Sequence, residues 1–177
     1  MLDQIQRLSA ENALQATADA RIVAIRWDVH PWSLVLDLDA PLSEAPGAML
    51  HRVWLAFLGL DGLCWPFDDS RVPAGVGTTS PIIMTAVGGG FRQYRFIALL
   101  PRHASDGSLV GSPSGTVIIR AQDLVGLVSA ASAASQPDGS TDWATRVALA
   151  SDHDLVQALH SAVERAGENE GPAGESA

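Results

Sequence analysis

Two irregular stretches of the chain contain the residue types from which a catalytic site could be built. Residues 68–80 open with two adjacent carboxylates and an arginine, and residues 102–115 contain a histidine and a further carboxylate. An arginine could bind an anionic group, a carboxylate could act as a general base or hold a metal ion, and the histidine could transfer protons. Long loops of compact domains are disproportionately functional. The residues of this hypothetical hydrolase or small-ligand site are Asp68, Asp69, Arg71, His103 and Asp106.

A second pair of carboxylates, Asp37 and Asp39, lies on one face of a predicted strand. Residues two apart in a strand have backbones about 7 Å apart, a spacing that could suit a cation or an acid–base pair. The neighbouring strand is predicted to place Arg26 opposite Asp37, so a ladder of opposite charges explains the same pattern. We therefore expect these carboxylates to form an exposed charge ladder.

Several large classes of enzyme require residues that the chain lacks. All eleven basic side chains are arginines, which excludes a lysine Schiff base, a pyridoxal phosphate anchor and a Walker A lysine. The five histidines are scattered, and no His-Glu-x-x-His or Cys-x-x-Cys spacing supports a zinc site. The single cysteine, Cys64, lies between Leu63 and Trp65, and we expect a buried, inert thiol. We expect neither a cofactor nor a metal ion.

The charge of the chain favours a basic protein as its partner. The formal net charge is −9, and the acidic excess lies in the first twenty residues and beyond residue 122. An acidic surface disfavours nucleic acids and anionic membranes and favours a partner of opposite charge. The chain has no apolar run of membrane-spanning length, and its first residues do not resemble a signal peptide. We therefore expect a cytoplasmic protein.

Two tryptophans and one helix are candidate contacts for such a partner. Trp32 and Trp65 adjoin prolines at predicted turns or strand ends, where a large ring is less easily buried. Exposed tryptophan is typical of interface hot spots, whereas Trp27 and Trp54 lie in apolar runs and are expected in the core. A predicted helix near the C-terminus has a narrow apolar stripe that must pack either on its own sheet or on a partner. The candidate partner-binding residues are Trp32, Trp65, Leu155 and Leu159.

Alternating apolar and polar residues predict strands throughout residues 21–121. The clearest is a hairpin that turns at Pro31-Trp32 and pairs Ile25 with Leu38, or the same hairpin slipped by two residues. Asp61-Gly62 predicts a hairpin turn after the strand at 50–60. The three glycines at 88–90 predict a further hairpin that places Met84 opposite Tyr94.

These patterns predict a single α+β domain over residues 1–166. We expect one antiparallel sheet of about six strands in residues 21–121, flanked by helices at 2–18, 124–134 and 152–166, and a disordered acidic tail at 167–177. The expected function is that of a non-enzymatic acidic protein-binding module, such as an inhibitor or immunity-type protein that neutralises a basic protein. The alternative is the hydrolase or ligand-binding domain with its site on the 68–80 and 102–115 loops. The oligomeric state is left open.

Overall fold

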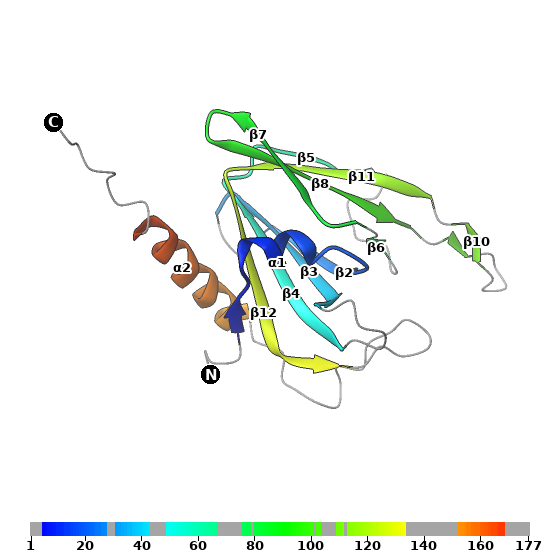
Figure 1. The fold of residues 1–177 in the computed structure, drawn as a ribbon, viewed down its shortest axis with the longest axis horizontal. Coiled ribbons are helices and arrows are strands. Elements are labelled where there is room, and N and C mark those ends of the chain that lie inside the picture. The colour runs from blue at the N-terminus through cyan, green and yellow to red at the C-terminus, as the bar shows by residue number, and fades with distance from the viewer. Residues whose placement is uncertain are drawn as a thin grey trace.

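The chain forms one strongly bent antiparallel sheet around a shared core, as the computed structural model shows (Figure 1). The structure describes residues 5–27, 31–42, 49–66, 76–78, 80–100, 102–103, 109–111, 113–133 and 152–168. Within these residues, ten strands form the main sheet and two form a separate small sheet. The elements are β1 (Ile5–Arg7), α1 (Ala10–Gln15), β2 (Arg21–Arg26), β3 (Ser33–Pro41), β4 (Leu50–Leu58), β5 (Gly62–Cys64), β6 (Gly77–Thr78), β7 (Ile83–Gly88), β8 (Phe91–Leu99), β9 (Arg102–His103), β10 (Leu109–Gly111), β11 (Ser114–Ala121), β12 (Asp123–Ala133) and α2 (Asp152–Glu168).

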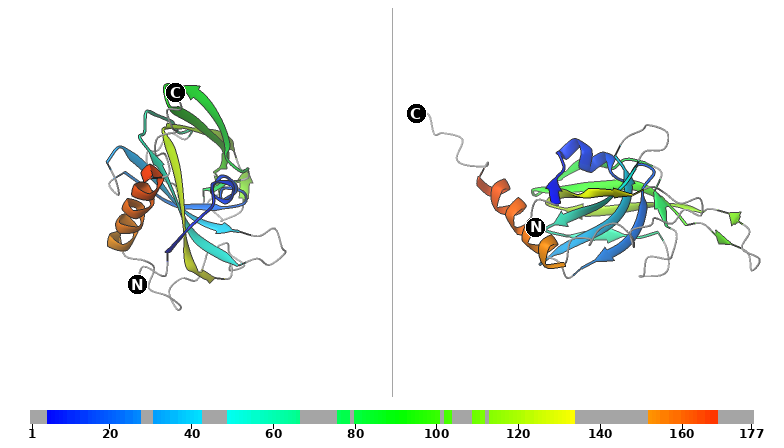
Figure 2. Two further views of the ribbon diagram at one scale, coloured as in Figure 1. Left: turned by 60° about the vertical axis from the view of Figure 1, so that its left-hand side comes forward. Right: turned by 90° about the horizontal axis from the view of Figure 1, so that it is seen from below.

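The strands follow the order β1-β12-β4-β3-β2-β6-β8-β11-β5, and β7 pairs with β8 outside this path. The sheet bends so that β12, β4, β3 and β2 face β8 and β11, with α1 between the two halves (Figures 1 and 2). Leu36 and Phe57 from one half share the buried core with Tyr94 and Ile119 from the other. The Phe57 and Tyr94 rings meet edge to face, with their centroids 5.3 Å apart.

The predicted α+β architecture is wrong, because the described chain is mostly antiparallel sheet with two helices rather than a six-stranded sheet flanked by helices. The clearest error is the helix expected at 124–134, which is the long strand β12. Its Ala/Ser-rich composition suits a helix, but β4 pairs with one side of it and β1 with the other. Val125 and Val128 are buried in the separate cores on the two faces of the sheet, so tertiary pairing overrides helix propensity.

The helix expected at 2–18 is much shorter than the spacing of its apolar residues suggested. Residues Ile5–Arg7 form β1 against β12, and α1 begins only after Ser9, whose side chain accepts a hydrogen bond from the Asn12 N–H at 3.2 Å. Helix α1 then packs on β12 at Gly126, where an added Cβ would lie 2.8 Å from the Cβ of Ala13. The glycine that weakens a helix at 124–134 therefore permits the close approach of α1.

Two of the three predicted hairpins are present. The β2–β3 hairpin has the two-residue slip, which pairs Ile25 with Leu36, and a bulge shifts the register again near Val23. The β7–β8 hairpin has the predicted register, with Met84 opposite Tyr94. The three glycines between these strands have positive φ angles, which a side chain would disfavour.

The hairpin predicted at Asp61-Gly62 is wrong. Strand β4 is central, but β5 pairs with β11 in the other half of the sheet and not with β4. The chain turns away at Gly59, which has a φ of 61° and whose Cβ position is occupied by the side chain of Gln122. Because Gln122 joins β11 to β12, the two crossings between the halves lie side by side at this corner.

The C-terminal helix packs on the protein's own sheet. Helix α2 spans Asp152–Glu168 and matches the helix predicted at 152–166, extending two residues into the segment expected to be a tail. Leu155 and Leu159 are buried in a second core with Val35, Trp54 and Leu127, on the face opposite α1. Residues 169–177 lie outside the described residues. Among the helices that the structure describes, none is long and apolar enough to cross a membrane.

The buried Tyr94 predicts a loss of stability at alkaline pH. Burial raises the pKa of its hydroxyl above the ordinary value of 10.0, and the nearby Arg92 guanidinium lowers it in part. Well below pH 10 the tyrosine is protonated in both states, so its contribution to stability is complete. Above pH 10 the unfolded chain loses this proton first, and the free energy of unfolding should fall until the folded pKa is passed.

Because Tyr94 is the only tyrosine, phenolate absorbance in the near ultraviolet reports on this residue alone. We expect the folded protein to ionise at higher pH than the denatured chain, and Tyr94→Phe to remove this part of the alkaline decline. Identical titration curves for the folded and denatured chains would contradict the prediction.

Candidate functional site

An open hollow of about 290 Å³ lies where the β2–β3 turn meets the corner after β4. We call it the tryptophan hollow, because two exposed indoles form part of its wall. It lies at the crossing corner of the sheet, so strand ends rather than a long loop hold its backbone. The residues that line it are Trp27, Trp32, Ser33, Leu60, Asp61 and Gly62.

Trp32 combines high exposure with a strained backbone. Its side chain is 82% exposed, and its φ is 53°, in the left-handed region that costs an L-residue about 1–2 kcal/mol. Its carbonyl accepts a hydrogen bond from the Leu60 N–H at 2.8 Å, and the next residue, Ser33, is buried at the start of β3. The corner therefore holds an aromatic side chain in solvent despite two unfavourable features, a pattern that points to function.

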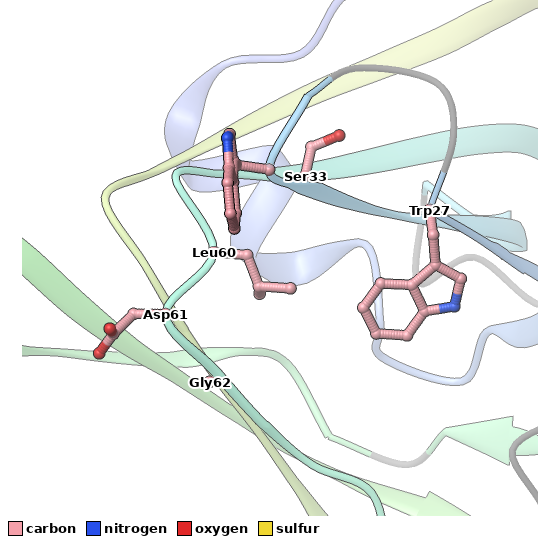
Figure 3. Close-up of a pocket in the computed structure, with 6 residues that line it drawn as sticks. Trp27, Ser33, Leu60, Asp61 and Gly62 are labelled. Carbon is pink, nitrogen blue, oxygen red and sulfur yellow. The ribbon is translucent and has the colours of Figure 1, made fainter.

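Trp27 forms another part of the wall and is 51% exposed, so the expectation that it lies in the core is wrong. The slipped hairpin register ends β2 at Arg26 and leaves Trp27 beyond the sheet. Figure 3 shows the Leu60 side chain pointing toward the Trp27 ring, with the Asp61 carboxylate directed away from both. The hollow is therefore bounded by apolar and aromatic groups.

The Asp61 carboxylate beside the hollow forms an ion pair. An oxygen of Asp61 lies 2.8 Å from the Nε of Arg120, and the Arg120 guanidinium lies 5.2 Å from the centroid of the Phe91 ring. The lining residues that the structure describes include no histidine or cysteine, and their one carboxylate is held by this ion pair. The hollow is thus suited to binding a side chain against its indoles and supplies no acid–base pair for a reaction.

Sequence reasoning named Trp32 as a candidate contact, placed Trp27 in the core and did not single out Leu60. The available signal for Trp32 was its place next to Pro31 just before a predicted strand, where a large ring is less easily buried. The role of Leu60 depends on the turn at Gly59, which sequence reasoning assigned to a strand running to residue 60.

Asp37 and Asp39 are buried, so the expectation of an exposed charge ladder is wrong. Their residues are 1% and 4% exposed, because they face the second core rather than solvent. An oxygen of Asp37 lies 2.8 Å from an Arg26 nitrogen, and Asp39 accepts a hydrogen bond from the Nε of Arg52 at 2.8 Å. Each carboxylate is neutralised by an arginine, which makes the pair structural rather than catalytic.

The predicted hydrolase site falls mostly outside the described residues. Asp68, Asp69, Arg71 and Asp106 lie outside them, and of His103 only the backbone is described, in β9 opposite Leu109. Whether these five residues converge on one site stays a prediction.

The other residues predicted to contact a partner are partly or fully buried. Trp65 is partly buried against the main core, and Leu155 and Leu159 are buried between α2 and its own sheet. Cys64 is exposed on the edge strand β5, so the expectation of a buried thiol is wrong. Of the residues expected to contact a partner, Trp32 alone projects fully from the described surface.

A larger hollow of about 680 Å³ lies between α1 and the end of β3. Glu11 and Asp19 are among its lining residues. No group of three or more histidine, cysteine or acidic side chains that could hold a metal ion occurs in the described part of the chain.

Comparisons of the chain with family models, curated proteins and solved structures give no match.

Proposed function

We propose that the protein is a non-enzymatic binding module that holds a basic segment of another protein in the tryptophan hollow. The observation that carries this proposal is Trp32, an indole 82% exposed on a backbone of positive φ. Tryptophan is one of the residues most enriched among interface hot spots. A strained and exposed indole is costly for a free monomer, and contact with a partner would offset that cost.

The basic character of the partner follows from charge and from the chemistry of indole. The face of a tryptophan ring attracts an arginine or lysine side chain, and the chain's net charge of −9 attracts a basic partner from a distance. Exposed Trp27 and Trp32 offer two such rings on one hollow. Neutralisation of a basic protein, as by inhibitor and immunity-type proteins, is the role that we propose for this binding.

The test is a selection of displayed peptides on the native protein, followed by calorimetric titration of the enriched sequences. We expect arginine- or lysine-containing peptides whose affinity falls as salt rises. Trp32→Ala should weaken their binding by about 2 kcal/mol or more, roughly thirty-fold in Kd.

Two further variants show whether weaker binding is due to the loss of the Trp32 indole. Leu42→Ala removes a side chain that is also exposed, at the opposite end of β3, and should leave binding unchanged. Trp32→Gly should bind as weakly as Trp32→Ala but be about 1 kcal/mol more stable, since glycine accepts a positive φ. Equal binding by wild type and Trp32→Ala, or a preference for acidic peptides, would count against the proposal.

A further inference from the structure

Strand β7 is an edge strand with both faces in solvent. Among the described residues it pairs only with β8, and all six of its residues are exposed. Ile83 is 53% exposed and Met84 is 47% exposed, and successive strand residues point to opposite faces. Figure 1 shows β7 at the periphery of the molecule, away from α2. Both faces of this strand therefore present large apolar side chains to water.

Within the described residues, the other two edges of the sheet are short and protected. Strands β1 and β5 have three residues each, and the first contains Arg7 while Pro66 follows the second. Strand β7 has six residues, contains no proline, and lies in a stretch without charge from residue 81 to residue 91. Natural proteins shorten, charge or cover their edge strands, because an open edge pairs readily with another chain. An unprotected apolar edge therefore indicates an interaction surface.

We propose that β7 pairs antiparallel with β7 of a second copy of this chain, about a two-fold axis. In the register centred on Thr85, this residue meets its own counterpart and Met84 meets the small Ala86 of the second copy. Ile83 then lies opposite Val87 of the second copy, so apolar residues meet apolar ones. The strand is thus complementary to itself, as a two-fold interface requires.

Charge favours a second copy over a basic partner at this edge. Both copies of the strand carry the same side chains, so any charge on β7 would be repelled by its equivalent across the two-fold axis. The strand has none, which lets two chains of net charge −9 approach here. The charged residues of β8 opposite β7 are Arg92 and Arg95, which disfavour the basic segment proposed for the tryptophan hollow.

Sedimentation of the full chain over a series of concentrations tests this proposal. We expect a reversible monomer–dimer equilibrium for wild type. Thr85→Glu and Thr85→Arg each place two like charges face to face, so each variant alone should remain monomeric at concentrations where wild type is dimeric. An equimolar mixture of the two should form a heterodimer, because opposite charges then meet at the axis.

Thr116 provides the matched control, because it is an exposed threonine on β11 that pairs with Ile97 inside the sheet. Thr116→Glu should dimerise like wild type, and circular dichroism should show every variant folded. Three results would each overturn the proposal: a monomeric wild type at all concentrations, dimers in both single variants, or no dimer in the mixture. A wild type that binds an acidic peptide along β7 but stays monomeric would likewise overturn the proposal.

Discussion

Arg52→Met should lower the free energy of unfolding by about 3–5 kcal/mol. The Nε of Arg52 donates to Asp39 at 2.8 Å, and the two side chains are only 10% and 5% exposed. Methionine fills much of the arginine volume but leaves the Asp39 carboxylate buried without this positive charge. Urea denaturation followed by circular dichroism measures the change as a lower midpoint with an unaltered slope.

The double variant Asp39→Leu, Arg52→Met separates charge from packing. Removing both charges removes the desolvation cost of both, so this variant should be clearly more stable than Arg52→Met alone. Asp61→Asn provides the exposed comparison, because Asp61 and Arg120 are 44% and 47% exposed and their separation should cost less than about 1 kcal/mol. Equal losses from the buried and the exposed pair would contradict the burial argument.

Phe57→Ala should cost about 3–5 kcal/mol, because it opens a cavity where the two halves of the sheet meet. Phe57 is fully buried, and its ring packs edge to face on Tyr94 of the opposite half. The loss includes this aromatic contact, which contributes about 0.5–1.5 kcal/mol beyond burial. Differential scanning calorimetry should show the change as a large fall in Tm.

Phe57→Leu keeps the assay informative if the alanine variant does not fold, because leucine fills most of the space. It should cost clearly less than alanine, while Val23→Ala, at a side chain 41% exposed, should change stability by about 0.5 kcal/mol or less. A Phe57→Ala protein as stable as the Val23→Ala protein would show that the halves are not joined through this ring.

Local pairing was predictable from the sequence, whereas the path of the chain between halves was not. Met84 opposite Tyr94 follows from alternation and a glycine turn, both of which are local properties. Strand β5 pairs with β11 rather than with β4 because the chain turns at Gly59, against the side chain of Gln122. These two residues are far apart in the chain. Strand β12 was mistaken for a helix because its alanines and serines favour a helix until β4 and β1 pair with it.

The candidate site was predictable only in part for the same reason. Trp32 was a candidate because it adjoins Pro31 beside a predicted strand, but Trp27 is exposed because the hairpin slips by two residues. Parity of the apolar pattern allows both registers, so the sequence could not choose between them. The burial of Asp37 was likewise not predictable, since an alternating pattern does not reveal whether the polar face of a strand is covered.

The pairing of β1 with β12 imposes an order on folding during synthesis. Ile5 leaves the ribosome 124 residues before its partner Ser129. At about 5–20 residues per second, the first strand waits roughly 6–25 s for its partner. Helix α1 waits as well, because it packs at Gly126. The hairpin of β2 and β3 can form early, but the core closes only when β12 arrives, so a nascent chain stalled before residue 123 should remain open to chaperones and proteases.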